Sequence, residues 1–112
     1  MNTDKLTVRL NCFQTAMLLE KKLCGDFGAS LTDSREVVSE GVKSRVLVFS
    51  RFYIRCASLL GLAVVLTEGD GFCEVAMQAS CGRKDAPIIG DMGAAADFCR
   101  EARTALDPFV IP

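Results

Sequence analysis

Residues 42–82 constrain the fold of this chain more than any other stretch, because they read as three extended segments joined by tight connections. Residues 43–56 and 72–81 alternate in character, as expected of strands with two different faces. Residues 59–68 form a nearly continuous apolar run, which predicts a central strand buried on both faces. The Gly-Asp-Gly sequence at residues 69–71 is the strongest turn signal in the chain and predicts a hairpin.

The N-terminal part predicts a strand followed by a helix. Residues 5–10 alternate strictly between polar and apolar side chains, which is typical of a half-buried strand. Asn11 and Gln14 have the spacing of a capping box. A helix is therefore predicted over residues 12–24, with Gly25 as its C-terminal cap.

Two further regions complete the pattern of elements. Residues 30–38 predict one or two short strands with a turn at Asp33, and their polar composition suits the edge of a sheet. Residues 92–106 have apolar side chains at helical spacing and predict a second helix that ends before Pro108. The apolar tail, residues 109–112, is expected to dock on the domain.

The element order is therefore β-α-β(β)-β-β-β-α, within a single domain that spans residues 1–112. A chain of this length can build one hydrophobic core without disulfides or metals. Runs of strands framed by helices favour an antiparallel sheet. We predict an α+β two-layer sandwich, in which an antiparallel sheet of four to five strands carries two helices packed on one face.

The complete absence of histidine limits the chemistry of this protein. It excludes Ser-His and Cys-His nucleophilic systems and every metal site with a histidine ligand. No other catalytic motif is recognisable, so a non-enzymatic role is favoured. The six cysteines include no closely spaced pair of the kind found in metal sites. We interpret them as reduced, buried thiols rather than a disulfide framework or a thiol switch, and we predict no metal and no cofactor.

Charge and hydropathy indicate a cytoplasmic protein. The net charge of −1 gives no general attraction to nucleic acid or to an anionic membrane. Residues 1–9 lack the apolar segment of a signal peptide, and the longest apolar run is far shorter than the roughly 20 residues that a bilayer requires. No membrane partner is therefore expected.

The segment over residues 43–56 supplies the leading candidate site. Its core face is predicted to consist of the following residues: Val46, Val48, Phe52, Ile54 and Cys56. The opposite, open face interleaves basic and aromatic side chains without an acidic residue. The candidate interface residues on this face are Arg45, Leu47, Phe49, Arg51, Tyr53 and Arg55.

An apolar surface with a charged rim is typical of a protein–protein interface. Self-association through the open sheet face, as a homodimer, is therefore the leading hypothesis. One alternative is an amphipathic strand with a purely structural role. The other is binding of nucleic acid or another anion, because aromatic and basic residues on an open sheet can stack bases and neutralise phosphates. The motifs of RNA-binding sheets are absent, so nucleic acid is disfavoured.

A second candidate site is the connection between the last strand and the last helix. Gly82, Arg83, Lys84 and Gly90 place basic side chains and glycines before a helix N-terminus, where a phosphate or carboxylate can bind. The spacing matches neither the P-loop nor the dinucleotide fingerprint, and Asp91 would repel an anion. The alternative interpretation is an ordinary strand-to-helix connection.

Residues 51–59, together with residues 80–82 and 93–94, carry a weak resemblance to a family of small uncharacterised bacterial domains. The resemblance implies a bacterial, cytoplasmic α+β domain and no particular activity. The sequence therefore predicts a non-enzymatic domain that self-associates through its open sheet face. The alternative is a module that binds a small anionic ligand, at residues 82–92 or in a pocket between sheet and helices.

Overall fold

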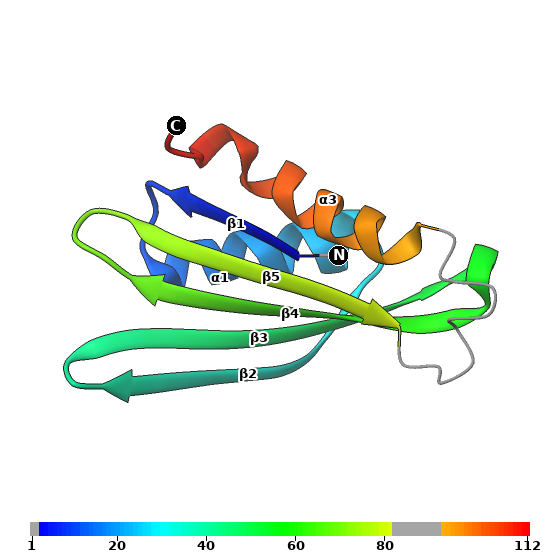
Figure 1. Cartoon of the computed structure of the whole chain (residues 1–112), viewed down its shortest axis with the longest axis horizontal. Helices are drawn as coiled ribbons and strands as arrows, with labels where there is room; N and C mark the ends of the chain where they lie inside the picture. The colour runs from blue at the N-terminus through cyan, green and yellow to red at the C-terminus, as the bar shows by residue number, and fades with distance from the viewer. Residues whose placement is uncertain (1–2, 82–92) are drawn as a thin grey trace.

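The computed structural model describes residues 3–81 and 93–112, apart from the side chain of Cys81, and contains a five-stranded antiparallel sheet with two α-helices (Figure 1). The predicted α+β fold is confirmed. The strands are β1 (Thr3–Val8), β2 (Ser30–Ser39), β3 (Val42–Tyr53), β4 (Ser58–Glu68) and β5 (Cys73–Cys81). The helices are α1 (Cys12–Glu20) and α3 (Ala94–Leu106).

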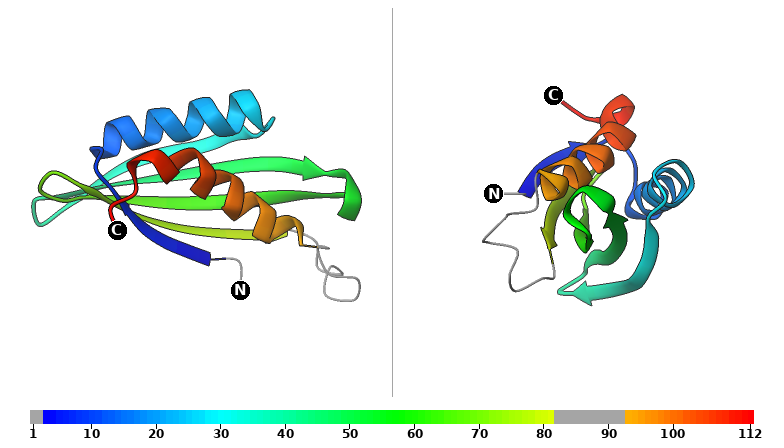
Figure 2. Two further views of the ribbon diagram at one scale, coloured as in Figure 1. Left: turned by 90° about the horizontal axis from the view of Figure 1, so that it is seen from above. Right: turned by 90° about the vertical axis from the view of Figure 1, so that its right-hand side faces the viewer.

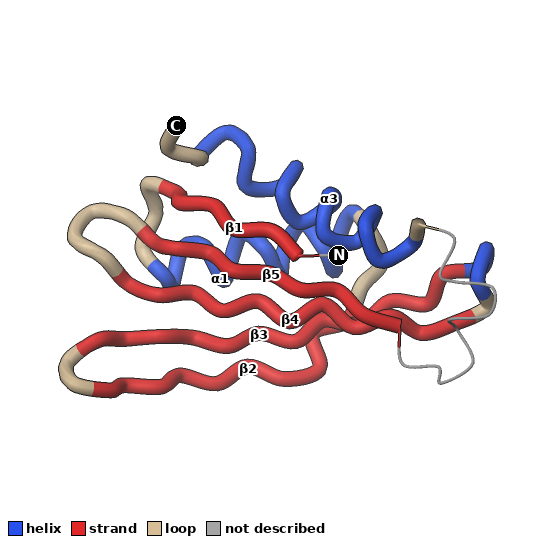
Figure 3. The backbone as a smooth tube through the Cα atoms, in the orientation of Figure 1, coloured by secondary structure: helices blue, strands red, loops and turns tan. Residues whose placement is uncertain are grey.

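The strand order across the sheet is β1-β5-β4-β3-β2, and every neighbouring pair is antiparallel (Figure 3). The strands β2 to β5 follow one another in space as they do in the chain. The N-terminal strand β1 instead pairs with β5 and forms the edge of the sheet opposite β2. The predicted central position of β4 is confirmed, but only one of its faces is buried.

Helix α1 begins as predicted and ends differently. The Asn11 side chain accepts a hydrogen bond from the Gln14 backbone at 2.7 Å, and the Gln14 side chain accepts one from the Asn11 backbone at 3.2 Å. Beyond Glu20 the helix continues as a π-helical turn over Lys21–Asp26, so Gly25 is not its cap. The left-handed conformation that favours glycine occurs instead at Gly28, with φ of 74°.

Strand β2 is longer and more regular than predicted. It lies at the edge of the sheet, and it runs through Asp33 without a turn. Its register against β3 shifts between Leu31 and Asp33, which is a β-bulge. The next strand, β3, ends earlier than predicted, because Ile54–Cys56 form a 3-10 turn and Ala57 adopts a left-handed conformation with φ of 49°.

Both helices cover the same face of the sheet, and the hydrophobic core lies between the two layers (Figure 2). The long β4 alternates strictly along Leu60, Leu62, Val64 and Leu66, which are all fully buried beneath the helices. Helix α3 contributes its apolar side, including Phe98, and packs on β5, β4 and β1. No helix in the described residues is long and apolar enough to cross a membrane.

The C-terminal tail docks beside β1, as expected. The Arg9 backbone donates a hydrogen bond to the carbonyl of Phe109 at 2.9 Å, and the Ile111 backbone donates one to Thr7 at 2.8 Å. Val110 forms an antiparallel bridge with Val8 between them. The tail therefore covers the outer edge of the sheet next to the end of β1.

Candidate functional site

The register of the sheet determines which side chains share a face. Val46 on β3 lies opposite Val65 on β4, and Leu47 lies opposite Val64. Directly opposite residues of antiparallel strands point to the same side of the sheet. Leu47 and Val64 are both almost completely buried, whereas Val65 is 39% exposed. The row with Leu47 therefore faces the helices, and the row with Val46 lies on the uncovered side, which we call the open face.

The faces predicted for β3 are reversed in the structure. Of the candidate interface residues, Leu47, Phe49 and Tyr53 are buried in the core, with Phe49 fully inaccessible. Phe52 and Ile54, which were predicted to be core residues, are 57% and 87% exposed. The prediction that the aromatic and basic row lies on the open face is therefore wrong.

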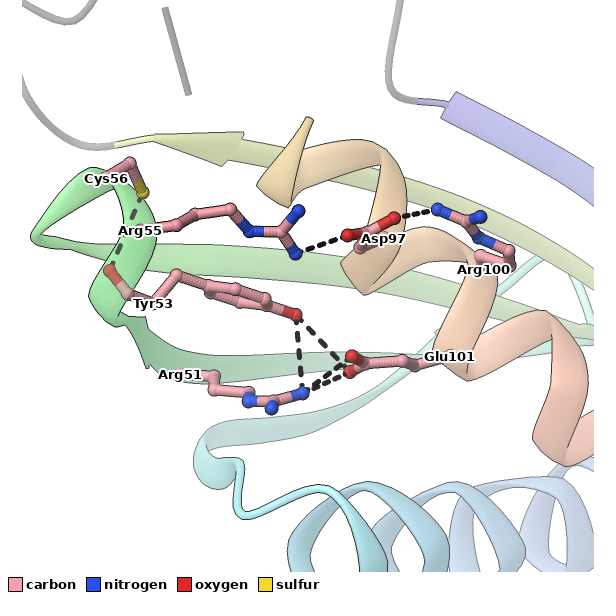
Figure 4. A network of polar contacts seen from close by, with 7 residues as sticks. All are labelled: Arg51, Tyr53, Arg55, Cys56, Asp97, Arg100 and Glu101. Carbon is pink, nitrogen blue, oxygen red and sulfur yellow. Dashed lines mark hydrogen bonds and ion pairs between the residues drawn. The ribbon is translucent and has the colours of Figure 1, made fainter. Parts of the chain in front are cut away.

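The reason for the reversal is that helix α3 supplies acidic partners for the arginines of that row (Figure 4). Arg51 donates to both carboxylate oxygens of Glu101 at 2.6 Å, and the Tyr53 hydroxyl donates to the same carboxylate at 3.3 Å. The Arg51 guanidinium also lies over the Tyr53 ring, 4.7 Å from its centroid. Burial and the nearby Glu101 carboxylate raise the pKa of Tyr53 to about 12.

A second acidic residue extends this contact. Asp97, one helical turn before Glu101, forms ion pairs with Arg55 and with Arg100 (Figure 4). The sixth candidate, Arg45, pairs with Glu36 on the neighbouring strand at 3.3 Å. Each of the three arginines in the predicted interface set therefore forms an ion pair with an acidic residue of the same domain.

Sequence reasoning missed the acidic partners, although a signal was present. Asp97 and Glu101 are four residues apart on the predicted last helix, so they share one of its sides. Arg51 and Arg55 are also four residues apart and supply two positive charges. A helix that packs on the aromatic row brings these two acidic and two basic groups together.

The open face carries apolar side chains in two groups, one on each side of the Ser50–Gly61 pair, and we call the two groups together its apolar centre. Phe52 on β3 lies opposite Leu59 on β4, and these side chains are 57% and 59% exposed. Further apolar residues follow at the alternate positions of β3, β4 and β5. They are Val46, Val48, Ala63, Val65 and Ala76.

Polar and charged residues surround this centre. Lys5 on β1 lies opposite Ala76, and Glu74 on β5 lies opposite Thr67. Arg35 lies opposite Val46 at the other edge of the sheet. Two shallow hollows of about 550 and 410 Å³ lie over β1, β5 and β4, and both are lined by Lys5, Val65 and Ala76. The open face is thus an apolar surface with a polar rim and a hollowed side.

A third hollow lies on the other side of the molecule, between the N-terminus of α1 and the β2–β3 hairpin. It has a volume of about 640 Å³, and Lys43 and Arg45 contribute to its lining. Glu68, also in its lining, accepts a hydrogen bond from the Cys12 backbone at 3.0 Å. Hydrogen bonds from the Cys12 thiol and from the Cys12 backbone hold the pKa of Glu68 below its ordinary value. The hollow therefore combines two basic side chains with two carboxylates, of which Glu68 already occupies the helix terminus and Glu36 pairs with Arg45.

The candidate ligand-binding residues Gly82, Arg83, Lys84 and Gly90 lie outside the described residues. Their proposed role stays a prediction. Within residues 3–81 and 93–112, no group of three or more acidic or cysteine side chains is placed to hold a metal ion.

Comparison of the chain with known protein families finds no matching family model, and comparison with curated proteins finds no similar sequence. The function of the chain is therefore inferred from its own sequence and geometry.

Proposed function

We propose that this domain is a non-enzymatic, cytoplasmic homodimer that assembles by packing the open faces of two sheets together. The observation that carries the proposal is the apolar centre of the open face. Large apolar side chains such as Phe52, Leu59 and Val65 remain substantially exposed in the single chain. Exposed apolar surface of this kind, with a polar rim, marks sites of protein association.

The size of the open face fits the area that a stable dimer needs. The face spans five strands, and the central strand β4 has 11 residues. At about 4.8 Å between strands and about 3.3 Å per residue, the face measures roughly 24 by 36 Å, or about 870 Å². Standard protein–protein interfaces bury about 800 Å² from each partner. Two such faces also stack about 10 Å apart in ordinary sandwiches, with interdigitated side chains.

The charge distribution favours a second copy as the occupant. The apolar centre contains no charged residue, and the rim carries both signs, with Lys5 and Arg35 against Glu74. Two identical surfaces with a neutral centre meet without like-charge repulsion at the core of the interface. Twofold pairing of one surface with itself is also the commonest form of assembly.

A matched pair of substitutions tests the proposal. Phe52 on the open face and Phe13 on the outer side of α1 are exposed to similar extents, 57% and 64%. We expect Phe52→Glu to convert a dimer into a monomer in analytical ultracentrifugation, because it places a charge in the apolar centre. Phe13→Glu should leave the dimer intact. A wild-type chain that sediments as a monomer at micromolar concentration would contradict the proposal.

The second candidate function is binding of a small anionic ligand. Its support is the hollow beside the N-terminus of α1, where Lys43 lies in the lining together with Arg45, whose charge is shared with Glu36. Inorganic pyrophosphate and citrate are suitable probes, read out by the shift in melting temperature. Loss of the shift in Lys43→Ala would assign the ligand to this hollow, and loss in Arg83→Ala would assign it to the 82–92 segment. No shift with either probe argues against this function.

A further inference from the structure

Two cysteines that are distant in the chain have adjacent sulfur atoms. Cys12 is the first residue of α1, and Cys73 is the first residue of β5. Both are free, and their Sγ atoms are 3.3 Å apart although the residues are separated by 61 positions. A disulfide requires an S–S distance of about 2.0 Å, so a small approach of the two sulfurs completes the bond.

The surroundings hold this pair in place. Glu68, at the end of β4, lies directly opposite Cys73 and accepts a hydrogen bond from the Cys12 backbone at 3.0 Å. The start of α1 is thereby fixed to the β4–β5 hairpin. Cys12 and Cys73 are each the first residue of a hydrogen-bonded element, and the fold places these two element ends beside each other.

One of the two thiols borders solvent. Cys12 lines the hollow beside the N-terminus of α1 and retains 6% exposure, whereas Cys73 is fully buried. A small oxidant can therefore approach Cys12 from this hollow, and Cys73 lies behind it. This is the arrangement of an attacking thiol and a resolving thiol.

We propose that Cys12 and Cys73 form a reversible disulfide when the protein meets hydrogen peroxide or a similarly small peroxide. The inference is independent of dimer formation, because the pair lies on the helix side of the sheet and not on the open face.

The reaction balances in two steps. The Cys12 thiolate attacks one peroxide oxygen, the O–O bond breaks, and the leaving hydroxide takes up a proton to become water. Cys12 is then a sulfenic acid. The Cys73 sulfur attacks the Cys12 sulfur, the S–O bond breaks, and the hydroxyl leaves as water with the proton that Cys73 gives up. Two thiols and one peroxide thus give one disulfide and two waters, and a dithiol reductant reverses the change.

The environment of the two thiols makes their oxidation slow. The disulfide is therefore suited to stabilising the fold and not to rapid sensing of peroxide. Burial raises the pKa of Cys12 well above its ordinary value, and the Glu68 carboxylate raises it further. Burial also raises the pKa of Cys73. The reactive thiolate is scarce at neutral pH, so the rate should increase with pH. Glu68→Gln, which removes the negative charge and keeps an acceptor oxygen, should increase it severalfold.

Peptide mapping tests the proposal in the unmodified chain. Cleavage after glutamate isolates Cys12 in residues 1–20 and Cys73 in residues 69–74, each as the only cysteine of its peptide. After peroxide treatment and blocking of the remaining thiols, we expect these two peptides to appear linked. Their mass should equal the sum of the two less two hydrogens, and dithiothreitol should separate them. Absence of this linked peptide, or its replacement by other pairings or by irreversibly oxidised Cys12, would overturn the proposal.

A stability measurement gives a second test. A cross-link between residues 61 positions apart restricts the unfolded chain, so the oxidised protein should melt roughly 10 °C or more above the reduced protein. Cys73→Ser should abolish this rise, and Cys24→Ser, a change at a partly exposed cysteine away from the pair, should keep it. An equal rise in Cys73→Ser would contradict the assignment of the bond.

Discussion

The two faces of the sheet both carry apolar side chains, but the open face also includes many polar residues, and the two faces differ in what covers them. On the helix side, Leu47, Phe49 and Tyr53 of β3 are buried with the alternate residues of β4. On the open face, Val46, Val48 and Phe52 of the same strand lie against solvent. The helix side also carries Arg51 and Arg55, and α3 supplies Glu101 and Asp97 as their ion-pair partners.

This difference shows that an alternating pattern identifies two faces without telling which one is covered. Basic side chains usually mark the solvent side of a strand, because an unpaired charge is costly to bury. In this chain the arginines extend along the border of the core, and their charges are matched by carboxylates from the helix above. The apolar row is the one without a cover.

The largest expected effect is the difference in stability loss when one aromatic residue on each face is replaced by alanine. Phe49→Ala should lower the free energy of unfolding by about 3–5 kcal/mol, because it opens a cavity in the core. Phe52→Ala should change it by less than about 0.5 kcal/mol in the monomer, since its side chain is largely exposed. Urea denaturation at a protein concentration where the chain is monomeric measures both. Equal losses of unfolding free energy in the two variants would contradict the assignment of one aromatic residue to the buried face and the other to the open face.

The ionisation of Tyr53 sharpens the comparison on the helix side. The chain has a single tyrosine, so tyrosinate absorbance reports this residue alone. Its pKa is raised to about 12 by burial and by Glu101. The folded state therefore keeps the proton in the window between the ordinary value of about 10 and 12, and stability falls as the pH rises through this window.

The corresponding measurement is a spectrophotometric titration with alkali. We expect a midpoint near 12 in the wild type. Glu101→Gln should lower the midpoint, because it removes the negative charge that opposes tyrosinate formation. A wild-type midpoint near 10, as in an open peptide, would place Tyr53 on the solvent side and contradict the structure.

The contact between Arg51 and Glu101 should have a moderate effect. Its two side chains are 28% and 18% exposed, so solvent screens the pair only in part. A double-mutant cycle with Arg51→Ala and Glu101→Ala should give a coupling free energy of about 1–2 kcal/mol. Additive effects of the two changes would show that the ion pair does not fix α3 on the sheet.

The smallest effect is expected from an ion pair on the exposed edge strand. Arg35 and Asp33 of β2 approach to 3.1 Å, but their side chains are 75% and 46% exposed. Asp33→Asn should change the free energy of unfolding by less than about 0.5 kcal/mol, which thermal denaturation at low and high salt can verify. A larger, salt-sensitive loss would mean that this edge is covered in solution.

Local signals in the sequence were sufficient to predict several helix ends and turns of the fold. The capping box at Asn11, the turn at residues 69–71 and the stop before Pro108 are short-range features, and each occurs where predicted. The bulge in β2 and the π-helical turn after α1 were not predicted. Both depend on how neighbouring strands and loops fit together, and no local residue pattern specifies them.

The candidate site was harder to predict, because it depends on long-range pairing. A shift of one residue in register moves every side chain of a strand to the other face. Ser50, the polar interruption in the predicted core row, was the local sign that this row faces outward. The proximity of Cys12 and Cys73 depends on the placement of α1 beside the β4–β5 hairpin, which no spacing in the sequence indicates.

The docked C-terminal tail limits how copies of this chain can polymerise. Polymers of sheets extend edge to edge, and such growth needs a free strand edge on both sides of each copy. The pairing of Val110 with Val8 obstructs one edge near the end of β1. At the other edge, β2 carries a bulge and charged side chains such as Asp33, Arg35 and Glu36. Because extension is hindered at both edges of the sheet, we expect the proposed association through the open faces to give a closed pair and not a fibre.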